Sequence, residues 1–323
     1  MDIEKYVVVT LQVIVFVLAC IGNTIVIIVT CKYLRFSVLT HRFIVNLAIA
    51  DMFTGVTALS QVVYVLVPEI ENNVYVCLLR YQVVLCMTLT SQLTVAFTIL
   101  DRYLAICFPH RYASIMNGRR ANVLITISWA YPVVLGVLPF CGLNSWESSK
   151  RCTFQEVTSP WQLLTMTLTL WSFTIIIVFM YALIIRRACL LYRQIKPLPS
   201  TPPKISLVLP EVARSSTEHC QRQVSVQSSS ADRREKTLHT LRGAKSLAAI
   251  TFMFSVCWLP HTYFQFRTYL DPAYVHSTEW GAANWLVFLG MSNSIMNPFI
   301  YAWQRRDFNT ACRRLFARGV QIE

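Results

Sequence analysis

Several chemically capable side chains lie inside long apolar stretches of this chain. Asp51 is the clearest case, because it falls within the apolar segment Phe43–Val67 and no Lys or Arg follows it there. A carboxylate in such surroundings either takes up a proton or finds a cation. Other polar residues also fall in apolar segments, namely Asn23, Ser91, Asn293, Ser294 and Asn297. Oxygen ligands of this kind suit a small hard cation such as sodium. The alternative is a neutral Asp51 that hydrogen-bonds to asparagine side chains and helps helices to pack.

A second group of residues combines an acid, a base and two prolines. Asp101, Arg102 and Tyr103 lie at the end of the third apolar segment, where an ion pair at the membrane interface is one simple use of them. Pro260 and Pro298 lie inside the sixth and seventh segments. Each proline removes a helix hydrogen bond and kinks its segment, which gives two breaks at which helix ends can swing.

Long membrane-spanning helices are needed to position these residues. The 323 residues are 55% hydrophobic and only 14% charged, whereas about 25% is typical of soluble domains. The chain therefore cannot cover a water-facing surface, and we expect an all-α membrane protein with seven spans. The expected spans are Tyr6–Thr30, Phe43–Val67, Val76–Phe108, Ala121–Phe140, Leu163–Ile185, Leu247–Phe266 and Trp280–Trp303.

The distribution of charge predicts how the helices are oriented. Lys and Arg gather in the first, third and fifth connections and in the tail, while the other connections carry mainly Asp and Glu. Because basic residues collect on the cytoplasmic side, the N terminus is expected outside and the tail inside. The net charge of +13 is then a signal of membrane topology beside anionic lipids, not a nucleic-acid footprint.

One long connection interrupts this pattern. Residues from about 190 to 236 are polar, first rich in proline and then in serine, which predicts a mobile cytoplasmic loop. Ser225 follows the basic Arg222 and is a candidate for phosphorylation. An unmodified flexible linker is the alternative.

Motifs on six of the seven segments occur in an order that resembles a rhodopsin-like (class A) G-protein-coupled receptor over essentially the whole chain. The resemblance implies a plasma-membrane protein with a seven-helix bundle, an extracellular ligand pocket and a cytoplasmic cavity for a heterotrimeric G protein. Arrestins and kinases are further partners of such receptors. The residues that carry the resemblance are Asn23, Asp51, Cys77, Asp101-Arg102-Tyr103, Trp129, Cys257-Trp258-Leu259-Pro260 and Asn297-Pro298-Phe299-Ile300-Tyr301.

The same resemblance assigns roles to individual residues. It implies a disulfide between Cys77 and Cys152 on the oxidising face. It implies that Trp258 lies on the pocket floor and that Arg102 meets the G protein. The family's sodium site matches Asp51, Ser91, Asn293 and Asn297, and its activation tyrosines match Tyr181 and Tyr301.

The resemblance also divides the chain. Residues 1–303 are expected to form the receptor domain, and residues 304–323 an amphipathic eighth helix with a short cytoplasmic tail. Basic and aromatic residues in this tail suit the anionic inner leaflet. Cys312 is a candidate for palmitoylation there, and a plain buried thiol is the alternative.

Within the family, the chain is most similar to adenosine receptors. The loop Cys152–Val157 resembles theirs, and Phe154 would stack on a flat base. An aromatic packed over the mouth of the bundle is the alternative for Phe154. Val84, Leu85 and Thr88 match pocket positions on the third span.

Departures from the adenosine-receptor pattern affect the expected pocket. Gln265 replaces an asparagine that binds the base, and it offers the same donor and acceptor. Met291 and Gly290 replace a histidine and a serine that face the ribose, so those contacts are lost. The Thr88 hydroxyl remains on that side, unless it bonds to its own backbone. His261 either faces the pocket or packs within the bundle.

A lipid receptor is the main alternative function. The runs Cys77–Arg80 and Leu289–Ser294 resemble receptors that sense fatty amides and lysolipids. Arg80 would then meet a polar head group, or else simply extend to the surface. Phe173 stands where the fifth span usually has proline, a departure shared with melanocortin and cannabinoid receptors. Thr240 replaces a Glu that many members pair with arginine, which predicts raised ligand-free signalling.

Other function classes fit less well. A transporter should show repeats or a chain of ionisable groups through the bilayer, and only Asp51 is found there. An enzyme would need a nucleophile or metal cluster, and the histidines are scattered without ligand spacing. We therefore expect no catalytic residues and no cofactor beyond an allosteric sodium ion.

Overall fold

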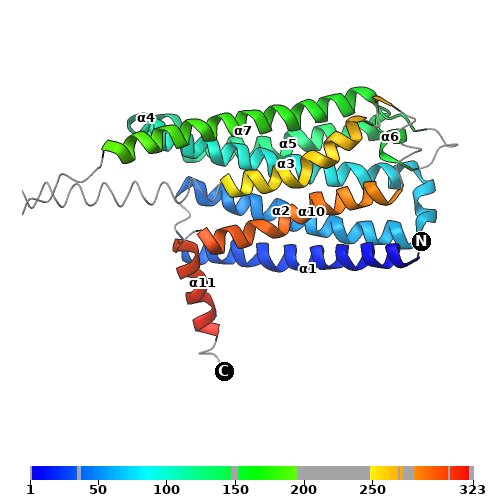
Figure 1. The fold of residues 1–323 in the computed structure, drawn as a ribbon, viewed down its shortest axis with the longest axis horizontal. Helices are drawn as coiled ribbons and strands as arrows, with labels where there is room; N and C mark the ends of the chain where they lie inside the picture. The colour runs from blue at the N-terminus through cyan, green and yellow to red at the C-terminus, as the bar shows by residue number, and fades with distance from the viewer. Residues whose placement is uncertain are drawn as a thin grey trace, which may run out of the picture.

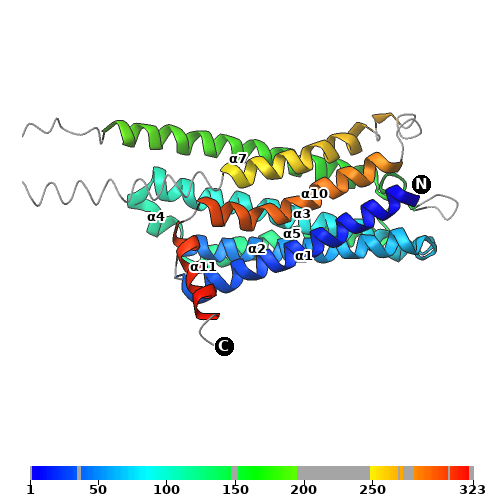
Figure 2. The same cartoon turned by 60° about the horizontal axis from the view of Figure 1, so that its bottom comes forward.

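The computed structural model describes residues 2–34, 38–146, 152–194, 248–267, 270–271, 280–304 and 306–319. Long helices lie side by side in one bundle, as Figures 1 and 2 show from two directions. No strand occurs in the described residues. The long helices are α1 (Asp2–Tyr33), α2 (Leu39–Leu66), α3 (Val74–Cys107), α5 (Gly118–Val137), α7 (Pro160–Gln194) and α10 (Trp280–Gln304), together with the helical residues 248–267.

Shorter helices connect or extend the long ones at the two ends of the bundle. The N terminus and α6 lie at one end, which we call the outer end, while α4 and α11 lie at the opposite, inner end (Figure 1). The short elements are η1 (Pro68–Asn72), α4 (Pro109–Ile115), η2 (Leu138–Cys141), α6 (Phe154–Val157) and α11 (Arg306–Gly319).

The lengths and composition of the helices fit a membrane. Within the described residues, five helices are long and apolar enough to cross one. The predicted sixth and seventh spans fall on residues 248–267 and α10, both helical. Large apolar side chains such as Val134, Ile175 and Phe179 are exposed on the outside of the bundle, where lipid can solvate them. The predicted all-α seven-helix fold is confirmed.

Two helices extend further than the apolar pattern predicts. α1 begins at Asp2 instead of Tyr6, and α7 continues to Gln194, so residues 190–194 are helical and not part of the expected loop. A helix of 35 residues is about 50 Å long, well beyond a hydrocarbon core of about 30 Å. Hydropathy reports only the part in contact with lipid, whereas the backbone hydrogen bonds continue past it.

Polar side chains fix where two helices begin. The Oδ1 atom of Asn73 accepts hydrogen bonds from the backbone of Tyr75 and Val76 at the start of α3. Asn117 accepts one from the backbone of Arg120 at the start of α5. Each cap satisfies amide groups that have no partner inside the helix. The cap at Asn73 defines the outer end of α3, the helix that carries most of the site.

Candidate functional site

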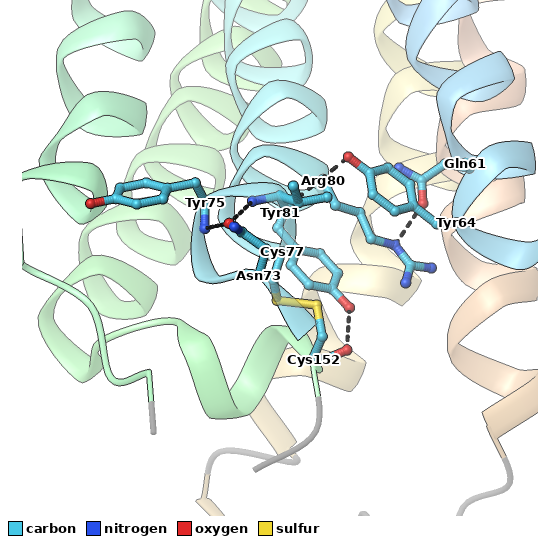
Figure 3. The surroundings of a disulfide bond; sticks show 9 residues. Gln61, Tyr64, Asn73, Tyr75, Cys77, Arg80, Tyr81 and Cys152 are labelled. Carbon is cyan, nitrogen blue, oxygen red and sulfur yellow. Dashed lines mark hydrogen bonds between the residues drawn. A yellow bond between two sulfur atoms is a disulfide. The ribbon is translucent and has the colours of Figure 1, made fainter. Parts of the chain in front are cut away.

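A disulfide anchors the outer end of α3. Cys77 and Cys152 are bonded at an S–S distance of 2.02 Å, which ties α3 to the segment that leads into α6 (Figure 3). The Tyr81 hydroxyl donates a hydrogen bond of 3.1 Å to the backbone oxygen of Cys152. The predicted disulfide is therefore confirmed, and it fixes the loop before α6 over the bundle.

Phe154 follows directly after this anchor, at the start of α6. Its ring makes an edge-to-face contact with the Tyr81 ring, with centroids 5.7 Å apart. The side chain is half-buried, so part of its surface remains accessible. The disulfide and the Tyr81 contact together hold Phe154 beside the outer end of α3.

Arg80 lies on the neighbouring face of α3 among aromatic and amide groups. Its Nε atom donates a 3.0 Å hydrogen bond to Oε1 of Gln61 on α2. Its guanidinium carbon lies 5.2 Å from the Tyr64 ring centroid and 5.4 Å from that of Tyr81 (Figure 3). These distances are typical of cation–π contacts. The sequence alone did not identify Tyr64 or Tyr81, because aromatic residues are common throughout the spans. It did not identify Gln61 either.

The predicted pocket residues on α3 lie near Trp258. Val84 and Leu85 pack against an apolar cluster that contains Trp258, so the structure brings these three residues together. The Thr88 hydroxyl donates a 2.8 Å hydrogen bond to the backbone oxygen of Val84. Of the two uses expected for Thr88, this geometry matches the bond to its own helix.

Two further predicted residues, His261 and Gln265, form a pair on residues 248–267. Nε2 of His261 and Nε2 of Gln265 are 3.2 Å apart, and the His261 ring meets the Trp258 ring edge to face. Met291 is fully buried in a separate cluster with Val15 and Ala58. Val84 of α3 also packs against this cluster, so Met291 lies between helices.

Two of the polar residues predicted for a sodium site, Ser91 and Asn297, contact Asp51. The carboxylate is fully buried and accepts hydrogen bonds from Ser91 Oγ at 3.2 Å and from Asn297 Nδ2 at 2.6 Å. Asn293 is buried one helical turn before Asn297. The Oδ1 atoms of both asparagines are buried and accept no hydrogen bond from the described residues. A carboxylate, a hydroxyl and two amide oxygens without donors match the ligand preference of a small hard cation.

At the inner end of α3, Asp101 accepts four hydrogen bonds from three residues. Arg102 donates two, at 2.6 and 3.0 Å, to Oδ2, and Thr40 donates one of 2.7 Å to the same atom. Tyr112 of α4 donates a bond of 2.6 Å to Oδ1. Burial and then the hydrogen bond to Asp101 raise the pKa of Tyr112 above its usual range. Tyr103 lies beside this group, with its ring edge-to-face against Phe108.

Thr40 and Tyr112 were not identified from the sequence. Thr40 looks like any polar residue at the start of a span, and Tyr112 lies 11 positions after Asp101. The only local signal is Pro109, which favours a new helix because proline is tolerated in the first turn. That signal predicts a helix but not the direction in which Tyr112 points.

The remaining predicted switch residues lie in the inner half of the bundle. Tyr301 is buried and contacts the Phe308 ring of α11 at 6.0 Å, while Tyr181 is half-buried against the same inner core cluster. Pro298 lies inside α10 and faces Gly22 of α1, where a Cβ atom would come within 3.0 Å of the proline ring.

Three expectations concern the segments that the sequence predicts to be cytoplasmic. Cys312 is half-buried against the inner core cluster, and burial raises the pKa of its thiol. Its palmitoylation stays a prediction. Ser225 and Thr240 lie outside the described residues.

Comparison with known proteins gives consistent matches. A model of the seven-transmembrane receptors of the rhodopsin family matches residues 22–301. The human adenosine receptor A2b is 27% identical over 311 residues, covering 96% of this chain and 90% of that receptor. The adenosine receptor A2a of Canis lupus familiaris is 27% identical, covering 98% of this chain and 73% of its own length. The human adenosine receptor A2a is 28% identical over 97% of this chain and 72% of that receptor.

Proposed function

The chain belongs to the rhodopsin family of seven-transmembrane receptors, and on that premise we propose that it binds a small extracellular ligand and activates heterotrimeric G proteins. It is a G-protein-coupled receptor and not an enzyme, as its matched relatives are. The proposal includes an extracellular N terminus and an allosteric sodium ion held by Asp51, Ser91, Asn293 and Asn297. The most similar receptors named above are adenosine receptors, so a purine is the first ligand class to consider.

One observation carries the proposal. The single helix α3 holds the disulfide-anchored loop at its outer end and the Asp101–Arg102 pair at its inner end. With 34 residues it is about 50 Å long, enough to connect the two sides of a membrane. A ligand that contacts the outer half of α3 can therefore bias the arrangement of groups around Arg102.

The position of Phe154 favours a ligand with a flat ring. The ring is held by Tyr81 on one edge while remaining half-exposed. Stacking of a base on such a ring contributes about 1–3 kcal/mol in other proteins. The His261–Gln265 pair provides donors and acceptors of the kind that read the edge of a heterocycle.

A lipid with a polar head group is the second candidate ligand. The observation in its favour is Arg80, whose guanidinium lies between the Tyr64 and Tyr81 rings and bonds to Gln61. A guanidinium held in this way is suited to a phosphate or carbonyl group.

The test is nucleotide exchange on an added heterotrimeric G protein with the receptor in lipid nanodiscs. A purine panel and a lipid panel are compared for the wild type, Phe154→Ala and Arg80→Gln. Purine agonism should weaken about tenfold or more in Phe154→Ala, and lipid agonism should weaken in Arg80→Gln. Tyr75→Ala is the matched control, because Tyr75 is 63% exposed and points away from Arg80 (Figure 3). Absence of exchange under every condition would contradict the proposal.

A further inference from the structure

The Trp258 ring lies directly against the backbone of α10 at Gly290. A Cβ atom at Gly290 would come within 2.8 Å of Cζ3 and 2.9 Å of Cε3 and Cη2 of the indole. Real Cβ atoms do not approach a neighbour this closely, so any other residue at Gly290 must displace the ring. All three atoms belong to the six-membered ring of the indole, which is rigid and cannot bend aside. Gly290 therefore determines where the Trp258 ring lies.

The side chains around this contact are apolar or have their polar atoms engaged. Val84 and Leu289 pack against the Trp258 cluster. Met291, which follows Gly290, is 0% exposed and belongs to a cluster against which Val84 also packs. The hydroxyl of Thr88, itself 4% exposed, donates to the backbone of its own helix. Among these described residues, the surroundings of the Gly290–Trp258 contact are therefore apolar. We call this part the inner end of the site.

Polar recognition begins further out on the same helix. His261 and Gln265 follow Trp258 by three and seven positions, which is about 4 and 10 Å along a helix axis toward the outer end. Their ring and amide nitrogens are 3.2 Å apart. The site therefore changes along its length. It is apolar at its inner end, beside Trp258, and has a pair of hydrogen-bonding side chains, His261 and Gln265, nearer the outer end.

We infer that this receptor selects ligands whose inner end is apolar and whose hydrogen-bonding group faces outward toward His261 and Gln265. The inference rests on the proposed function and names the ligand class for that site. An inner end with several hydroxyl groups is excluded, because each hydroxyl buried without a partner weakens binding roughly ten- to a hundredfold. Gly290 is the specificity-determining residue, since it sets the position of the Trp258 ring.

The contact itself is tested by a double-mutant cycle on thermal stability, which needs no ligand. Gly290→Ala should lower the Tm of the receptor in nanodiscs by several degrees. In a Trp258→Phe background the same change should cost much less, because phenylalanine lacks the three contacting atoms. Gly55→Ala is the matched control, since its Cβ would meet Ala19 at 2.9 Å and its effect should add to that of Trp258→Phe. Additive effects of Gly290→Ala and Trp258→Phe would overturn the assigned contact.

The ligand class is tested with a matched pair of probes. Adenosine and N9-butyladenine share the base and differ in whether ribose or an alkyl group is attached, and oleamide is the apolar-ended probe without a base. We expect N9-butyladenine or oleamide to stimulate G-protein nucleotide exchange at a concentration at least tenfold below that of adenosine. A receptor that exchanges nucleotide but prefers adenosine, or responds to neither apolar-ended probe, overturns the inference while the proposed function stands. A protein that never stimulates exchange contradicts the proposed function instead.

Discussion

Tyr112 of α4 donates a 2.6 Å hydrogen bond to Asp101 at the inner end of α3. The other carboxylate oxygen of Asp101 accepts bonds from Thr40 and Arg102. The short helix α4 and the start of α2 are therefore joined through the acid that pairs with Arg102. A change in the position of α4 must alter the surroundings of that ion pair.

Removing the Tyr112 hydroxyl should destabilise this arrangement. Tyr112→Phe deletes one hydrogen bond to a charged group, which is worth about 2 kcal/mol. We expect a Tm lower by a few degrees in nanodiscs, measured by thermal unfolding. Tyr75→Phe is the control, because its ring is largely exposed and distant from Asp101. Equal Tm values for Tyr112→Phe and the wild type would show that the bond contributes nothing.

The raised pKa of Tyr112 predicts how stability changes in alkaline solution. Burial and the bond to Asp101 raise the pKa of Tyr112 above its ordinary value of 10.0. Above that pH the unfolded chain releases the proton while the folded protein retains it, so stability falls as the pH rises. Tm measured from pH 8 to 11 should fall more steeply above pH 10 for the wild type than for Tyr112→Phe. Parallel curves would be incompatible with this role of the hydroxyl.

Sodium should stabilise the receptor through Asp51. The buried carboxylate, the Ser91 hydroxyl and the Oδ1 atoms of Asn293 and Asn297 supply the oxygen ligands proposed above. We expect the Tm to rise by several degrees when sodium chloride replaces choline chloride at equal ionic strength. Asp51→Asn, which preserves shape, should abolish the rise. A sodium effect that survives Asp51→Asn would place the ion elsewhere.

Ligand-free signalling should respond to Thr240. By the family pattern, a Glu at this position would add an ion pair with Arg102 of about 1 kcal/mol in the inactive state. Thr240→Glu should therefore lower basal nucleotide exchange about fivefold, whereas Thr240→Gln, of similar size but without charge, should not. Equal basal exchange in wild type and Thr240→Glu would sink this account.

The sequence predicted the elements and the polar residues inside them for a clear physical reason. A span must be apolar over some twenty residues, so a single acid such as Asp51 is conspicuous and its neighbours in the fold can be sought among other polar residues in spans. The Cys77–Cys152 bond was likewise predicted, through the resemblance to a known family. The sodium ligands and the switch roles stay predictions, although the structure places Asp51 beside Ser91 and Asn297.

Contacts that depend on direction in space could not be predicted. Tyr112 reaches Asp101 because α4 turns back beneath α3, and no periodic pattern encodes that turn. The closeness of Gly290 to Trp258 depends on how two helices cross. The start of α1 was predicted too late and the end of α7 too early, since hydropathy reports contact with lipid and helix hydrogen bonding continues into water.

The most direct test of the central claim is the effect of Arg102 on nucleotide exchange. Wild type, Arg102→Ala and Arg119→Ala are compared in nanodiscs with a heterotrimeric G protein, without ligand and with each of the three probes. Arg119 is the matched control because it is an exposed arginine in the first turn of α5. The account predicts that the wild type and Arg119→Ala accelerate exchange over empty nanodiscs and that Arg102→Ala loses about tenfold or more of this acceleration. No acceleration by the wild type under any condition, or equal acceleration by Arg102→Ala, would contradict it.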